Sequence, residues 1–180
     1  MARLSTTRRV HAAVLRLAEA DGPDSLTMEG IAAEAGVGKQ TLYRSWPGIT
    51  ALIFDALLAE SAAQADGAGQ PPGGVVDAVV ELLDETAREM STPPREVLLR
   101  WLAGRIQTDE DAAAQYRTRL LEPQRETVHA FLRGRGVDDV ERVAEALLAP
   151  VFYRWFMRDA PMTRDELLAL VERTLADQRS

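Results

Sequence analysis

The chain has 180 residues, a formal net charge of −7, 46% hydrophobic residues and no cysteine. This length suits one ordinary domain or two small ones and excludes a large multidomain machine, while the hydrophobic content is sufficient for a core. Without cysteine, the chain cannot form a disulfide, a thiolate zinc site or a cysteine nucleophile.

The negative charge is not spread evenly along the chain. Residues 1–50 contain six basic and five acidic residues and carry +1, whereas the other 130 contain 15 basic and 23 acidic residues and carry −8. The whole chain therefore lacks the charge of a polyanion binder, but its first segment is locally basic. No stretch approaches the roughly 20 apolar residues of a membrane helix, and no apolar signal-peptide region follows the N-terminus. The expected location is the cytoplasm.

Helical periodicity runs through the whole chain, and no strand pattern competes with it. An apolar stripe predicts a first helix that ends before residues 21–23. Thr27 is placed as the N-cap of a short helix over 28–35, which Gly36 ends. A second short helix follows from about Lys39 to Ser45, and a longer one runs from residue 49 to about 65.

Residues 66–74 contain four glycines and two prolines, a composition that cannot continue a helix and indicates a linker. Five further helices are predicted after it. The third of them carries Pro123 in its interior and the fourth carries Pro150, while a Thr-x-x-Glu capping box opens the last one at Thr163. The predicted fold is all-α, with about nine helices in total.

The two short helices have the residues that a helix-turn-helix requires. Ala32 is small enough for a close helix crossing, and Gly36 permits the positive φ of the turn. Ile31 and Leu42 have the spacing to face the first helix, so the second short helix turns its polar side outward. That side has donors and one cation on a helix that can enter a major groove. The pattern therefore predicts a recognition helix.

The outward residues divide by what they can reach on DNA. Lys39 and Gln40 are long enough to contact base edges, while hydroxyl groups suit phosphate oxygens. Gly38 permits close approach, Arg44 can serve either purpose, and the first helix adds a basic arm. The predicted DNA-contacting residues are Thr27, Gly38, Lys39, Gln40, Thr41, Tyr43, Arg44 and Arg8. Trp46, by contrast, is interpreted as a core aromatic that holds the fourth helix to the first.

The run TMEGIAAEAGVGKQTLYRSW at 27–46 resembles the helix-turn-helix signature of the TetR (tetracycline-repressor type) family, particularly A-x-x-A-G-V followed by T-L-Y-R-x-W. The match is strong over about residues 5–60, and residues 109–175 resemble a ligand-domain type found in many family members from GC-rich bacteria. The resemblance implies a homodimeric transcriptional repressor that a small molecule releases from a palindromic operator. One departure is Ile49, because family members often have there a lysine that touches a phosphate.

The expected organisation follows from the linker and the motif. It comprises a helix-turn-helix DNA-binding domain at 1–48 with its motif at about 28–47, a connecting helix at 49–66, a linker at 67–74, and a ligand-binding and dimerisation domain at 75–180.

The C-terminal helices carry more bulky apolar residues than a DNA-binding domain needs. Part of their interior is interpreted as a ligand cavity, because gaps between bundled helices are usual sites. The candidate pocket residues are Met90, Trp101, Arg105, Tyr116, Leu120, Phe131 and Phe152. The last two helices are expected to present apolar faces that a second copy covers about a two-fold axis. The candidate dimer residues are Leu147, Val151, Trp155, Leu168, Val171 and Leu175.

The sequence is also compatible with two other functions. A DNA-binding regulator with a filled core would respond to a protein partner or to nothing. An enzyme is less favoured, because no G-x-S-x-G, P-loop or dinucleotide motif occurs in the sequence. No catalytic residue, cofactor or metal is predicted. Neither His11 nor His129 has a second histidine or an acid three or four residues after it, and Glu126, three residues before His129, is interpreted as a coincidence.

Overall fold

We describe residues 2–65 and 74–177 in a computed structural model of the chain, in which every regular element of the described residues is a helix. The all-α prediction is confirmed. The predicted linker at 67–74 lies outside the described residues except for Gly74. The chain forms two compact units: unit 1 comprises Met1–Ala68 and Thr92–Leu120, and unit 2 comprises Gly69–Ser91 and Leu121–Ser180.

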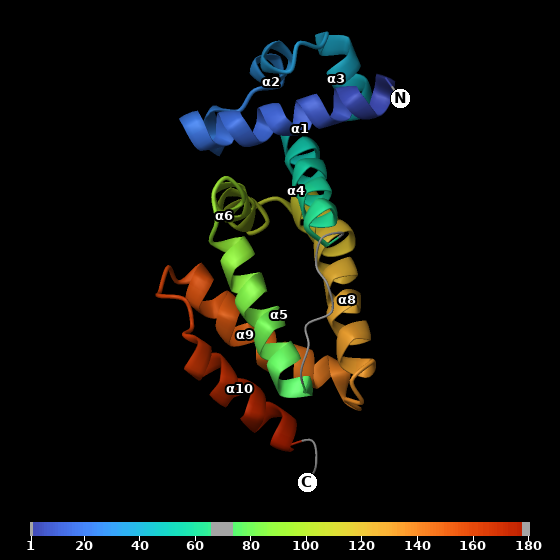
Figure 1. The fold of residues 1–180 in the computed structure, drawn as a ribbon. Coiled ribbons are helices and arrows are strands. Elements are labelled where there is room, and N and C mark those ends of the chain that lie inside the picture. The colour runs from blue at the N-terminus through green and yellow to red at the C-terminus, as the bar shows by residue number, and fades with distance from the viewer. Residues whose placement is uncertain (1, 66–73, 178–180) are drawn as a thin grey trace. The chain divides into compact units, whose positions relative to one another are not determined.

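Unit 1 contains the predicted helix-turn-helix and two later helices. Its elements are α1 (Ala2–Asp21), the short 3-10 helix η1 (Pro23–Ser25), α2 (Met28–Glu34), α3 (Lys39–Ser45), α4 (Ile49–Ala65), α6 (Arg95–Arg105) and α7 (Glu110–Tyr116). Helices α2 and α4 pack on α1, and α3 packs on α2 (Figure 1). The shared core includes Val10, Val14, Ile31, Leu42 and Leu52, all with side chains fully buried. Burial of these apolar stripes is the main force that holds such short helices.

Helix α6 belongs to unit 1 because it packs on α1, η1 and α4. Trp101 Nε1 donates a hydrogen bond of 2.9 Å to Asp24 Oδ1 in η1. Arg95 is buried at 8% exposure, and its Nη1 donates to the carbonyl oxygen of Leu57 in α4 at 3.4 Å. The compact units therefore do not follow the order of the chain, and the predicted functional division at the linker stays a prediction.

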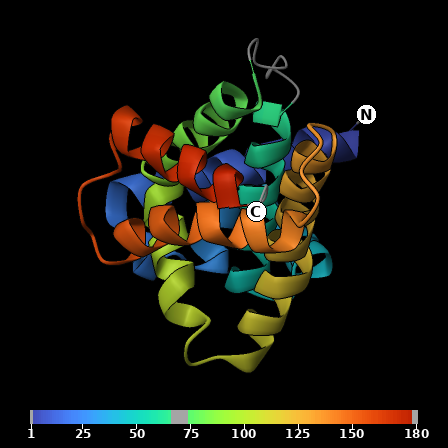
Figure 2. The ribbon, with the colours of Figure 1, turned by 90° about the horizontal axis from the view of Figure 1, so that it is seen from below.

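Unit 2 is a bundle of α5 (Val75–Met90), α8 (Glu122–Arg133), α9 (Val140–Phe156) and α10 (Arg164–Ala176). Helix α10 lies along α5 and α9, and α8 packs on α9 (Figures 1 and 2). The buried core of the unit includes Val79, Leu83, Leu132, Leu147, Leu167 and Val171. The capping box predicted at Thr163 is confirmed, because its Oγ1 accepts from the backbone N–H of Glu166, whose carboxylate accepts from Thr163 N at 2.8 Å.

The long helix predicted after residue 108 is interrupted by a π-helical turn, η2 (Arg117–Leu121), between α7 and α8. Pro123 lies in the first turn of α8, where its missing N–H removes less helical bonding than in a helix interior. Counted as one interrupted helix, Glu110 to Arg133 brings the α-helices of the described residues to the predicted nine. Among these helices, none is both long enough and apolar enough to cross a membrane.

Candidate nucleic-acid interface

The turn between α2 and α3 is built by local interactions that the sequence predicts. Thr27 Oγ1 accepts a hydrogen bond of 3.0 Å from the backbone N–H of Gly30 and thereby caps α2. Gly36 has a φ of 63°, a conformation in which residues with a Cβ are strained. The backbone N–H of Val37 donates to Ala32 O at 2.9 Å and closes the end of α2. The next residues can therefore leave α2 steeply and start α3.

Helix α3 has one buried side and one exposed side. Leu42 is fully buried, whereas the next residue, Tyr43, is 50% exposed. Lys39, Gln40 and Arg44 are exposed as well, and Thr41 is half-buried. Gly38, the N-cap of α3, is exposed, as are Thr27 and Arg8. These positions agree with an outward recognition face, but contact with DNA stays a prediction.

Sequence reasoning did not include Glu29 in this face. Its Oε1 lies 3.4 Å from Lys39 Nζ and accepts a long hydrogen bond of 3.5 Å from the Tyr43 hydroxyl. A hydrogen bond to its own backbone lowers the pKa of Glu29, and the charge of Lys39 lowers it further. Glu29 is therefore an ionised carboxylate beside two predicted DNA-contacting residues. Glu29 also lies in the first turn of α2, where a carboxylate favours the helix.

Trp46 is 7% exposed, which confirms its interpretation as a core aromatic. It is the C-cap of α3, and its ring packs edge-on against His11 of α1 with a centroid separation of 6.0 Å. Its Nε1 donates to Asp55 Oδ2 of α4 at 2.9 Å. Asp55 also accepts from Arg119 of η2 at 3.2 Å. No sequence signal pointed to this cluster, because its members are distant along the chain.

The seven candidate pocket residues are divided between the two units. Trp101, Arg105, Tyr116 and Leu120 belong to unit 1, whereas Met90, Phe131 and Phe152 belong to unit 2. Arg105 is exposed, and its Nε lies 3.4 Å from Asp109 Oδ2. Burial raises the pKa of Tyr116. A ligand role for the seven stays a prediction.

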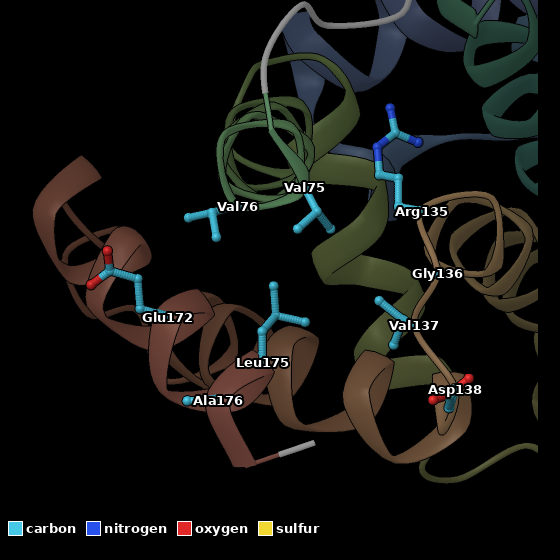
Figure 3. A pocket seen from close by; sticks show the side chains of 9 residues that line it. All are labelled: Val75, Val76, Arg135, Gly136, Val137, Asp138, Glu172, Leu175 and Ala176. Carbon is cyan, nitrogen blue, oxygen red and sulfur yellow. The ribbon is translucent and has the colours of Figure 1, made fainter. Parts of the chain in front are cut away.

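Unit 2 has a hollow of about 280 Å³ where the start of α5, the turn before α9 and the end of α10 meet (Figure 3). Its apolar lining consists of Val75, Val76, Val137, Leu175 and Ala176. Arg135 lies at its edge, and its guanidinium is 3.6 Å from the centre of the Phe131 ring. None of the seven candidate pocket residues lines this hollow.

The six candidate dimer residues differ in how far unit 2 buries them. Leu147, Val151, Val171 and Leu175 are between 0% and 9% exposed in the core of unit 2, so they need no second copy to cover them. α9 and α10 turn these four toward each other and toward α5 and α8, and a role for them in a dimer stays a prediction. A fifth candidate, Trp155, is half-buried and donates through Nε1 to Met90 O at 2.9 Å.

The exposed apolar surface of unit 2 consists largely of other residues. Large hydrophobic side chains exposed on α9 and just after it are Tyr153 at 64%, Phe156 at 59% and Met157 at 57%. On α10, Leu168 is 37% exposed and is the one dimer candidate in this exposed set. Residues 153, 156 and 157 follow helical spacing and so lie on one face.

Comparisons with known protein families match both parts of the chain. Residues 11–56 match the model of the bacterial regulatory proteins of the tetR family. Residues 71–174 match a model described as a tetracyclin repressor-like C-terminal domain. The two matches together include the helix-turn-helix and most of unit 2.

Individual relatives agree with these matches. An uncharacterised HTH-type transcriptional regulator of Bacillus subtilis, YdeS, is 30% identical over 142 residues, which span 74% of this chain and 69% of the relative. The crystal structure of the TetR family transcription regulator SCO0332 is 29% identical, with a TM-score of 0.75 over 95% of this chain and 97% of that one. The multidrug binding protein EbrR, solved with ethidium, shares the fold at 21% identity and a TM-score of 0.64, over 94% of this chain and 98% of that one.

Proposed function

Because the chain belongs to the tetR family of bacterial regulatory proteins, we propose that it is a DNA-binding repressor that a small molecule releases from a palindromic operator. The observation that carries this proposal is the polar outer side of α3, opposite the fully buried Leu42. The repressor acts in the cytoplasm, where bacterial DNA lies.

In the proposed complex, α3 enters the major groove. Lys39 and Gln40 contact base edges, because they are exposed at the start of α3 and are long. Hydroxyl groups and the remaining exposed residues contact the backbone and set the register. These positioning residues are Thr27, Gly38, Thr41, Tyr43, Arg44 and Arg8.

A selection of duplexes from a random-sequence library tests DNA recognition with the full chain. The selected duplexes are expected to contain inverted half-sites about 34 Å apart, or a multiple of that distance. Gln40→Ala should change the preferred base at one position, whereas Thr41→Ala should weaken all sequences similarly. Arg173→Ala is the control, because Arg173 is exposed on α10. Selected sequences without symmetry, or full binding by Lys39→Ala, would contradict the proposal.

The protein binds as a homodimer in this proposal, because one short recognition helix reads too few bases. The exposed apolar residues Tyr153, Phe156, Met157 and Leu168 support a self-association face on α9 and α10. Tyr153→Glu should give a monomer in sedimentation, and Glu145→Lys serves as a control because Glu145 is exposed on α9. A dimer that persists in Tyr153→Glu would place the association elsewhere.

The small-molecule effector is proposed to bind the C-terminal part of the chain. EbrR, which shares the fold, was solved with ethidium, and this chain has both the hollow of Figure 3 and the seven candidate pocket residues. A compound screen by thermal shift of the protein alone would identify a ligand. Ala176→Trp should block it if the hollow is the site, since Ala176 is exposed at the rim, and Phe152→Ala should weaken it if the candidate residues hold it.

The regulatory step requires that ligand and operator oppose each other. By linkage, a ligand that weakens operator binding by some factor must itself bind the operator complex more weakly by the same factor. Titrations of the ligand with and without the selected duplex measure both factors. Operator affinity that does not change at saturating ligand would refute the release mechanism and leave DNA binding intact.

A further inference from the structure

A single carboxylate in unit 1 accepts hydrogen bonds from side chains of three other segments. Asp55 of α4 accepts from Trp46 Nε1 at 2.9 Å through Oδ2 and from Arg119 Nη2 at 3.2 Å through Oδ1. His11 Nε2 of α1 lies 3.1 Å from Oδ2. The cluster therefore joins α1, the C-cap of α3, α4 and the π-helical turn η2.

Trp46 depends on this carboxylate more than the other donors do. An indole N–H can only donate, and Trp46 is 7% exposed, so loss of the acceptor would leave a buried donor unpaired. Trp46 is also the C-cap residue of α3, and its backbone N–H donates to Leu42 O at 2.9 Å. The direction in which α3 ends is therefore tied to the position of the Asp55 carboxylate.

Arg119 connects the same carboxylate to a different part of the chain. It lies in η2, a π-helical turn, and such turns are frequent at functional sites. The chain passes from unit 1 into unit 2 between Leu120 and Leu121. Helix α8 begins at Glu122, only three residues after Arg119. A rearrangement of the start of α8 would therefore also displace Arg119.

The exposure of the pair argues against a purely stabilising role. The side chains of Arg119 and Asp55 are 36% and 34% exposed, and ion pairs with this much solvent contact contribute little to stability. Removal of Arg119 should therefore leave unit 1 folded and change how the Asp55 carboxylate is held.

We propose that Asp55 is a positioning residue for DNA binding, which sets the orientation of α3 through Trp46 and is itself held by Arg119. A change at the passage into unit 2 then alters operator affinity without contact between the altered residues and DNA. This inference rests on the proposed role of α3 as the recognition helix.

The first experiment observes Trp46 without DNA. The chain has three tryptophans, so a ¹H–¹⁵N spectrum contains three indole signals, which Trp101→Phe and Trp155→Phe assign by elimination. Arg119→Gln is expected to shift the Trp46 signal and to speed exchange of its N–H with solvent. Arg117→Gln is the matched control, because Arg117 is exposed in the same turn and the variant removes the same charge.

The second experiment measures affinity for a duplex selected by the wild-type protein, at fixed salt. Arg119→Gln is expected to bind roughly three- to tenfold more weakly than Arg117→Gln, which lies in the lower part of the range of coupling found within one hydrogen-bonded network. In an Asp55→Asn background, Arg119→Gln should have no further effect, because both changes act on the same carboxylate.

The outcomes separate this inference from the proposed function. Equal affinities for the two arginine variants, or an unmoved Trp46 signal in Arg119→Gln, would overturn the positioning role. Additive effects of Asp55→Asn and Arg119→Gln would overturn it as well. If the wild-type chain selects no duplex, the proposed function fails, and the indole spectra still decide whether Arg119 holds Asp55 and Trp46.

Discussion

Replacement of Glu29 should make operator binding depend more steeply on salt. In the free chain, the Glu29 carboxylate lies 3.4 Å from the ammonium group of Lys39, and both side chains are at least half exposed. The hydrogen bond to its backbone and the charge of Lys39 lower the pKa of Glu29, so the carboxylate is ionised at pH 7. It therefore cancels part of the charge that Lys39 offers to DNA and repels nearby phosphates.

The size of the effect follows from counterion release. If Glu29→Gln removes the nearby negative charge so that the face around Lys39 neutralises one additional phosphate, the slope of log Kobs against log salt becomes steeper by about 0.9 for each half-site. A dimer on two half-sites should therefore show a change of about 1.8. Affinity for DNA of random sequence should rise as well, because a phosphate contact carries no sequence information.

Fluorescence anisotropy of a labelled duplex from about 50 to 200 mM salt measures this slope. Glu34→Gln is the matched control, because Glu34 lies on the same helix and pairs with Arg16 of α1 at 2.9 Å. If both variants steepen the slope equally, net charge alone explains the change. If Glu29→Gln leaves the slope unchanged, Glu29 does not restrain Lys39 and the reasoning fails.

Four further predictions concern single positions. Leu167→Ala should lower the free energy of unfolding by about 2–5 kcal/mol in urea titrations, because Leu167 is fully buried, whereas the adjacent Leu168→Ala should cost under about 1.5 kcal/mol; equal losses would contradict the assigned burial. The guanidinium of Arg154 and the backbone N–H of Thr163 lower the pKa of Glu166 to about 2, below its ordinary value of 4.5. Glu166 therefore stabilises unit 2 above pH 4.5, and this contribution should disappear as the pH falls from 4.5 to 2. The free energy of unfolding of Glu166→Gln, measured over the same pH range, should lack this decrease. Thr27→Ala should lower stability by about 1 kcal/mol through loss of the cap of α2, and Thr27→Ser should restore it. Ile49→Lys, at the first residue of α4, should steepen the salt slope by about 0.9 for each half-site, and an unchanged slope would exclude a phosphate near this position.

Local chemistry made the helix-turn-helix predictable. The caps at Thr27 and Thr163, the positive φ of Gly36 and the opposite faces of Leu42 and Tyr43 depend on residues within one or two helical turns. Such interactions have fixed spacing, so a sequence pattern can identify them. The outward face of α3 was predictable for the same reason.

The sequence could not predict which surface covers each apolar helix face. Periodicity predicts that α9 and α10 have apolar faces, but it does not say whether the same chain or a second copy covers them. The structure buries Val171 in the core of unit 2 and leaves Leu168 37% exposed. The predicted dimer face combined both kinds of residue.

By itself, the sequence determined the all-α fold, the ends of most helices and the inward and outward sides of α3, because each depends on neighbours within a few residues. Only the tertiary structure decided that Trp101 bonds to Asp24, that Glu29 lies beside Lys39, and that Asp55 gathers donors from α1, the end of α3 and η2. The physical reason is that a hydrogen bond or ion pair requires atoms within about 3–4 Å. Helical periodicity alone cannot bring distant residues to that separation, since it does not fix how one helix packs on another.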